Sequence, residues 1–160
     1  MRSIDRILNE AKRKRKYFDQ LDNILFLDYD GVVNTDYNNF GQEPFNTDCI
    51  NNVNRLCKEF NLKVVISSSW RDYPNHLDIL YKSGLDKDIT VLGSTKQLDK
   101  SREDEIIDYL KDHIYIDKFV ILDDCEMSIL KDYHVKTIFE RGFDKDKYIE
   151  SVKILSKQNS

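Results

Sequence analysis

Two aspartates, Asp28 and Asp30, stand two positions apart directly after the apolar run Ile24–Leu27, and Gly31 follows them. A short run that is apolar throughout is typical of a strand buried on both faces of a parallel sheet. The carboxyl end of such a strand is where open α/β sheets place their ligands, and a glycine there lets the backbone turn. Two like charges at a buried position are unfavourable unless a cation or a raised pKa relieves them. The pair therefore points to metal-assisted chemistry.

Two further apolar runs end in polar side chains. Leu62–Ile66 leads into three serines at positions 67–69, and Phe119–Leu122 leads into Asp123 and Asp124. Because the carboxyl ends of parallel strands lie at the same edge of a sheet, we expect these side chains to meet the first acid pair in one crevice.

This inventory predicts phosphoryl transfer. Carboxylates suit Mg²⁺, while hydroxyl and guanidinium groups suit phosphate oxygens. One aspartate can attack phosphorus to form an aspartyl-phosphate, and a second can protonate the leaving oxygen and then activate water. The nearby cations are Arg71, Lys96, Lys100 and Arg102.

Alternating strands and helices are needed to position these groups. We expect strands at residues 24–27, 62–66, 89–92, 119–122 and 135–139. We expect helices at residues 3–21, 47–60 and about 74–83, from 101, around Met127 and Leu130, and from about 144. This alternation predicts an α/β fold with a five-stranded parallel sheet and helices on both faces.

The four polar segments, in this order, resemble the motifs of the haloacid dehalogenase (HAD) superfamily of phosphohydrolases. The matching segments are residues 28–31, residues 64–69, Arg102 at a helix start, and residues 119–124. They frame about residues 24–140. The resemblance implies a Rossmann-like HAD fold and an Mg²⁺-dependent phosphatase, a phosphoric monoester hydrolase.

The resemblance also implies a role for each acid. Asp28 is expected to be the nucleophile and a metal ligand. Asp30 is expected to be the general acid and base, with its backbone carbonyl also at the metal. Asp123 and Asp124 are expected to complete the metal site, and which of them touches the ion stays open.

Two residues are expected to hold the phosphate. Ser68 would bind the transferring phosphoryl group, although either neighbouring serine is an alternative. Arg102 would neutralise the phosphate, with Lys96 or Lys100 as alternatives.

A narrower resemblance concerns the phrase Ser-Ser-Trp-Arg at residues 68–71. Together with residues 102–106 and 122–124, it is similar to HAD domains found with RNA-repair enzymes and to the phosphatase half of polynucleotide kinase-phosphatase. This similarity implies that Arg71 binds substrate, and Ser69 and Lys96 are further candidates for substrate binding.

The spacing leaves no room for a cap domain. Only residues 32–67 separate Gly31 from Ser68, and an expected helix and strand use most of them. An uncapped crevice would admit a macromolecular end, such as a nucleic-acid terminus. The segment Thr35–Phe45 is expected to form a small flap. Its aromatic side chains can either stack on a base or pack the flap, and packing is the favoured reading.

Composition is consistent with one globular domain at residues 22–160, preceded by a basic amphipathic helix at residues 1–21. The net charge of −4 excludes a molecule-wide basic field for nucleic acid. The basic run Lys12–Lys16 is read as a solvated helix face, with a nucleic-acid or localisation patch as the alternative.

Three cysteines without CxxC spacing favour a reducing, cytoplasmic setting, and no membrane span or signal sequence is expected. The oligomeric state stays open.

Other functional classes fit less well. A catalytically silent phosphate- or nucleic-acid-binding module of the same fold would not need Asp28 and Asp30, yet both are present. A receiver domain would carry its acid pair on the first strand and a lone acid later, which is the reverse order. A metal-dependent nuclease would need a glutamate on an earlier strand.

Overall fold

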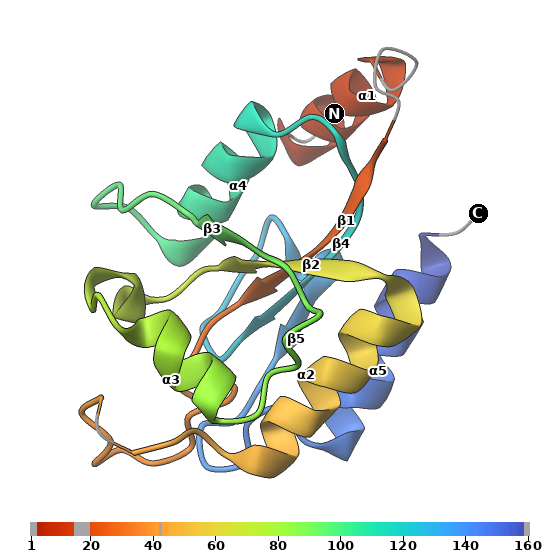
Figure 1. The fold of residues 1–160 in the computed structure, drawn as a ribbon. Helices are drawn as coiled ribbons and strands as arrows, with labels where there is room; N and C mark the ends of the chain where they lie inside the picture. Colours follow the sequence, from red (N-terminus) through yellow and green to blue (C-terminus); the bar gives the residue numbers. More distant parts are fainter. Residues whose placement is uncertain (1–2, 15–19, 42, 159–160) are drawn as a thin grey trace.

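A five-stranded parallel sheet organises the protein (Figure 1). The computed structural model describes residues 3–14, 20–41 and 43–158. The strand order is β3-β2-β1-β4-β5, and every neighbouring pair is parallel. The strands are β1 (Asp22–Leu27), β2 (Leu62–Ile66), β3 (Val91–Ser94), β4 (Ile116–Asp123) and β5 (His134–Lys136). The predicted α/β architecture is thereby confirmed.

Helices cover both faces of this sheet (Figure 1). The α-helices are α1 (Ser3–Lys14), α2 (Thr47–Phe60), α3 (His76–Lys82), α4 (Arg102–Asp112) and α5 (Lys145–Lys157). Short 3₁₀ helices are η2 (Ser69–Asp72) and η3 (Lys131–Tyr133). Helices α2, α3 and α5 share one hydrophobic core with the sheet, whereas α1 and α4 share the other.

The central strand β1 explains both cores, because side chains of a strand alternate between faces. Leu25 and Leu27 belong to the core under α2 and α5, while Ile24 and Phe26 belong to the core under α4. All four are fully buried, as expected for a strand covered on both sides.

The register between neighbouring strands brings the three polar segments to the same level at the edge of the sheet. Leu27 pairs with Ile66 of β2 on one side and with Leu122 of β4 on the other. The next residues along the three strands therefore emerge together at the carboxyl edge of the sheet. They are Asp28, Ser67 and Asp123.

Helices α2 and α4 have side-chain N-caps. Asn46 accepts from the backbone N–H of Cys49, and Ser101 accepts from that of Asp104. Such caps satisfy N–H groups that have no partner inside the helix. The cap at Ser101 begins α4 at Arg102, which sets the position of that side chain.

Strands β1 and β4 begin two and three residues earlier than expected, and two further strands also differ from the sequence predictions. Strand β3 runs from Val91 to Ser94, two residues later than expected, and its register against β2 shifts between Val64 and Val65. Strand β5 ends at Lys136, because Ile138 forms an isolated antiparallel bridge with Gly142 instead of continuing the sheet.

Two expected helices also differ. No α-helix forms around Met127 and Leu130; only the short 3₁₀ helix η3 follows, and the backbone N–H of Leu130 donates to the carboxylate of Glu103 at 2.8 Å instead of to a carbonyl one turn earlier. The helix expected at residues 3–21 ends by Lys14 in the described part of the chain, and residues 15–19 lie outside it. Leu21 is not helical, because the chain must be extended to enter β1 at Asp22.

No cap domain is inserted among the described residues between Gly31 and Ser68, as expected. They form a loop up to Asn46, then α2 and β2. Asn39 stabilises the loop, since its amide donates to Asn34 Oδ1 and to the carbonyl of Glu43.

In the described parts of the chain, no helix combines the length and apolarity that crossing a membrane requires.

Candidate active site

Asp28 lies at the centre of the carboxyl edge, directly after β1. The residue is only 5% exposed, and its Oδ1 accepts from the backbone N–H of Tyr29 at 2.8 Å. Burial and the facing carboxylate of Asp123 raise the pKa of Asp28 well above its usual range, against the lowering effects of Arg102 and of a hydrogen bond from Ser68. This environment disfavours the ionised form of Asp28, and further positive charge would favour it.

Asp28 forms a cluster with the two acids that follow β4. Carboxylate oxygens of Asp28, Asp123 and Asp124 all lie within 4.8 Å of one another. Burial and Asp123 also raise the pKa of Asp124. Three convergent carboxylates are the hard oxygen donors that Mg²⁺ prefers, so this donor set fits that ion.

Gly31 makes room for the cluster. Its φ of +78° lies in the left-handed region, and a Cβ built on it would come within 2.6 Å of the Asp124 Cγ. A side chain at position 31 would therefore displace the Asp124 carboxylate. Gly31 therefore has two roles. It allows the backbone to turn after Asp30, and it leaves space for the carboxylate of Asp124.

Arg102 is the cation that the structure brings to these acids. Its Nη1 donates to Asp123 Oδ2 at 2.9 Å and to the carbonyl of Ser67 at 2.5 Å, and it lies 3.3 Å from Asp28 Oδ1. Burial lowers the pKa of Arg102, but the facing carboxylates of Asp28 and Asp123 raise it by more. The guanidinium is therefore a positive charge held directly beside the acid cluster.

The two alternative cations lie elsewhere. The amine of Lys96 is 3.7 Å from Asp112 at the far end of α4, and its side chain is exposed. Lys100 is also exposed. The predicted contact of Lys96 with substrate stays a prediction.

The three serines after β2 have different surroundings. Ser67 is buried, and its hydroxyl has no partner among the described residues. Ser68 is buried against Asp28 and accepts from the backbone N–H of Trp70 at 3.2 Å. Ser69 is exposed and lines a separate hollow beside Asp30. Ser68 is therefore the serine whose side chain contacts the central acid.

Asp30 is not one of the three clustered acids, and its carboxylate has partners of its own. Its Oδ1 accepts from Trp70 Nε1 and from Asn34 Nδ2, both at 2.8 Å. These two bonds hold one oxygen of Asp30 in place. The predicted approach of its backbone carbonyl to a metal stays a prediction.

Trp70 and Asn34 were missed as contacts of Asp30 by the sequence reasoning. A signal existed for Trp70, because a buried tryptophan usually finds a partner for its N–H. Trp70 is 3% exposed and follows the strand next to β1, so an acid at the end of β1 was within reach. Asn34 carried no comparable signal, since its position depends on the turn after Gly31.

Arg71 is held in an ion pair instead of standing free at the crevice. Its Nη2 donates to both carboxylate oxygens of Glu105, at 3.0 and 3.2 Å, and Nη1 donates to Thr95 Oγ1 at 3.4 Å. Glu105 also lies 3.8 Å from Arg102, so one buried carboxylate links the two arginines. The expected role of Arg71 in substrate binding stays a prediction. Glu105 was missed, although it stands one helical turn after Arg102.

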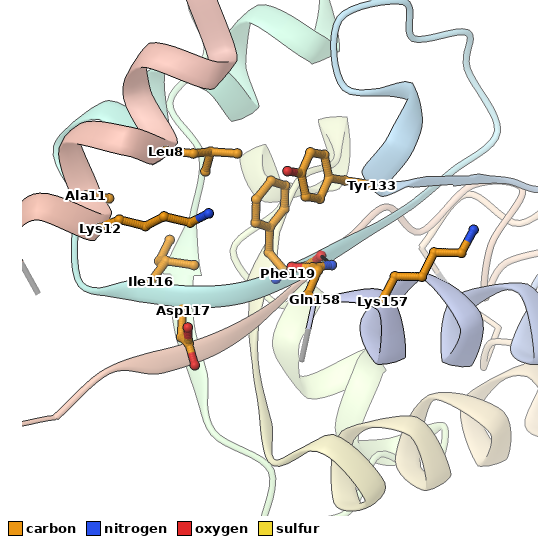
Figure 2. A pocket seen from close by; sticks show the side chains of 9 residues that line it. All are labelled: Leu8, Ala11, Lys12, Ile116, Asp117, Phe119, Tyr133, Lys157 and Gln158. Atoms are coloured by element: carbon orange, nitrogen blue, oxygen red, sulfur yellow. Dashed lines mark hydrogen bonds between the residues drawn. The ribbon is translucent and has the colours of Figure 1, made fainter. Parts of the chain in front are cut away.

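A second hollow lies far from these acids. Figure 2 shows its lining side chains, which come from α1, the early part of β4, Tyr133 and the end of α5. Ile116, one of them, begins the strand whose opposite end carries Asp123. This hollow is therefore at the other edge of the sheet and contributes nothing to the acid cluster.

One comparison with known proteins bears on this site. The family model described as "HAD domain in Swiss Army Knife RNA repair proteins" matches residues 24–148. This range includes every acid of the cluster, the serines and Arg102. No curated protein and no solved structure gives a significant match.

Proposed function

Since the chain belongs to the family of HAD domains found in Swiss Army Knife RNA repair proteins, we propose that it is an Mg²⁺-dependent phosphomonoester hydrolase acting through an aspartyl-phosphate. The observation that carries this proposal is the buried cluster of Asp28, Asp123 and Asp124 with Arg102 beside it. Removing the carboxylates of Asp28 and Asp123 from water, and that of Asp124 in part, is costly for a fold that gains nothing from them. A catalytic role supplies the reason to keep them.

The cluster would hold the metal through Asp28, Asp123 and Asp124. Bound Mg²⁺ would neutralise charge on the acids and on the transferring phosphoryl group. Arg102 adds a fixed positive charge at the same place. Together these charges would keep Asp28 ionised despite its burial, which a nucleophilic carboxylate requires.

The residues divide the reaction between them. A carboxylate oxygen of Asp28 attacks phosphorus, and the bond from phosphorus to the leaving oxygen breaks. Asp30 gives its proton to that oxygen, then accepts a proton from water that attacks the aspartyl-phosphate and releases inorganic phosphate. Ser68 and Arg102 bind phosphoryl oxygens throughout.

Hydrolysis of an aryl phosphate with and without Mg²⁺ tests this function. We expect Mg²⁺-dependent turnover that Asp28→Asn abolishes. Asp22→Asn is a matched control, because Asp22 is on the same strand but pairs with Lys63 outside the site. The proposal fails if wild type hydrolyses neither aryl phosphates nor 3′- or 5′-phosphorylated oligonucleotides. In that case a silent phosphate- or nucleic-acid-binding module is the better reading.

The substrate is proposed to be a phosphorylated nucleic-acid terminus. The family association with RNA repair supports this choice, and so does the absence of a cap over the described part of the crevice. A panel of phosphorylated oligonucleotides, nucleotides and phosphopeptides would assign it. Greater kcat/KM for phosphopeptides than for oligonucleotides would contradict it.

A further inference from the structure

Beside the acid cluster is a small hollow of about 210 Å³ with an unusual lining. Asp30 forms part of its wall, and three segments contribute aromatic rings to it. The lining rings are Tyr37, Phe40, Trp70, Tyr73 and Phe139. They come from the loop after β1, the segment after β2 and the segment after β5.

Exposed aromatic rings gather at this hollow. Among the described residues, the exposed large aromatic side chains are Phe40 (78%), Tyr37 (63%) and Tyr73 (51%), and all three line it. Single exposed apolar residues need no explanation, but a group around one hollow marks a binding site. The other exposed large hydrophobic residues are aliphatic and lie elsewhere.

Several of these rings are held in place. Tyr37 stacks on Phe139 with centroids 3.8 Å apart, and its hydroxyl donates to Glu140 at 2.9 Å. Tyr73 meets Trp70 edge to face at 5.4 Å. Trp70 in turn donates to Asp30. The hollow is therefore a preformed aromatic surface joined to the proposed general acid.

The position of Asp30 says which part of a substrate this hollow receives. In the proposed reaction Asp30 gives its proton to the leaving oxygen, so the group attached to that oxygen lies on the Asp30 side. The phosphoryl group lies on the other side, at Asp28 and Arg102. The hollow is thus the place of the leaving group.

The lining chemistry favours a flat ring over a phosphate chain. The lining contains the carboxylates of Asp30 and Asp36 and neither lysine nor arginine among the described residues. Further phosphates would be repelled here, whereas nucleobases stack on aromatic rings without needing charge. The volume is also below the roughly 300–1,000 Å³ of sites that enclose a whole drug-sized ligand. It suits one portion of a substrate.

We propose that this hollow is the leaving-group subsite, and that it holds the nucleobase of an unpaired terminal nucleotide by stacking on Phe40 and Tyr73. This inference rests on the proposed function and names the substrate feature that the site selects. A paired base is unavailable for such stacking, so the substrate end is single-stranded. Because neither lysine nor arginine lines the hollow in the part of the chain that the structure describes, the hollow recognises the terminal nucleotide and not the polymer beyond it.

Matched oligonucleotides test the subsite. One carries a normal terminal nucleotide and the other an abasic one with the same phosphate. Wild type should prefer the base-bearing substrate about tenfold or more in kcat/KM, as one stacked base contributes. Phe40→Ala and Tyr73→Ala should each reduce this preference. The control Ile149→Ala removes an exposed apolar side chain on α5 and should keep it.

A binding readout keeps the test independent of turnover. Trp70 is the single tryptophan of the chain and lines the hollow, so its fluorescence reports a base stacked there. In the Asp28→Asn protein, a phosphorylated dinucleotide should quench this fluorescence and its abasic analogue should not. A longer oligonucleotide should bind with similar affinity and a shallow dependence on salt.

Specific outcomes would overturn the proposal. Equal kcat/KM for the base-bearing and abasic substrates would refute base stacking, even though activity on both would leave the phosphatase function standing. A preference for a phosphotyrosyl peptide that Phe40→Ala removes would assign the hollow to a protein side chain instead. If no substrate is hydrolysed, the proposed function fails, and absence of dinucleotide quenching then refutes the subsite separately.

Discussion

Replacing Asp28 by asparagine should abolish activity and yet stabilise the metal-free protein. Asparagine keeps an Oδ1 atom that can accept from the backbone N–H of Tyr29, while the negative charge is lost. The expected gain in stability comes from the charges around this position. Asp123 and Asp124 repel an ionised Asp28, and Arg102 attracts it.

The size of this effect follows from the distances. The carboxylate oxygens lie no more than 4.8 Å apart, and at an effective dielectric constant of about 20 two unit charges at that upper limit interact by about 3.5 kcal/mol. Two neighbouring carboxylates thus oppose ionisation of Asp28 by at least about 7 kcal/mol. Arg102 at 3.3 Å offsets about 5 kcal/mol of that. A net repulsion of at least about 2 kcal/mol is left, to which burial adds.

Thermal unfolding in chelator measures the prediction. For a chain of this length, about 2 kcal/mol corresponds to a rise in Tm of about 4–8 °C. Mg²⁺ should stabilise wild type by mass action and the variant less. In the matched control Asp22→Asn, loss of the 2.8 Å pair with Lys63 should lower Tm slightly, because a partly exposed pair contributes at most about 1 kcal/mol.

The pH dependence has a definite sign. The pKa of Asp28 is raised in the folded protein above its usual value of 3.8. Below pH 3.8 the group is protonated in both states, so wild type and Asp28→Asn should differ little. As pH rises through the folded pKa, wild type should lose stability relative to the variant. A metal-free variant with a lower Tm than wild type at neutral pH would refute the reasoning.

Three further perturbations have expected results. Trp70→Phe removes the 2.8 Å hydrogen bond to Asp30 while keeping a ring in the core, and kcat should fall about twofold to tenfold, since a typical hydrogen bond contributes about 0.5–1.5 kcal/mol. Gly31→Ala places a Cβ against Asp124 at a φ of +78°, so stability should fall by about 1–2 kcal/mol and the Mg²⁺ concentration for half-maximal activity should rise. Burial raises the pKa of Cys57 to about 12, so iodoacetamide should alkylate it at pH 8 only after unfolding.

Each of these predictions has a clear contrary result. Unchanged kcat in Trp70→Phe would mean that its hydrogen bond does not position Asp30. Gly93→Ala is the control for Gly31→Ala, because φ is +147° there but nothing lies near the added Cβ. Equal effects of the two glycine variants on Mg²⁺ dependence would exclude the clash. Alkylation of Cys57 in the folded protein as fast as after unfolding would show that the thiol is accessible.

Local patterns in the sequence carried most of the fold. Apolar runs bounded by polar residues predicted the central strands, and β2 and α2 have the expected bounds. The errors occurred at edges. Strand β3 is displaced and mostly exposed, so no strong apolar pattern marks its bounds. The α-helix expected near Met127 does not form, because the backbone N–H of Leu130 donates a hydrogen bond to Glu103. Glu103 is distant in the sequence, so no local pattern indicates this contact.

The sequence by itself determined that two acid pairs and a serine run follow strands, because strand formation and alternation depend on neighbouring residues. It also determined that they meet, because parallel strands share one carboxyl edge. Only the tertiary structure decided which groups touch. Arg102 rather than Lys96 faces the acids, Ser68 rather than Ser69 contacts Asp28, and Trp70 holds Asp30. These choices depend on side-chain direction and on contacts between segments far apart in the chain, which residue order does not specify.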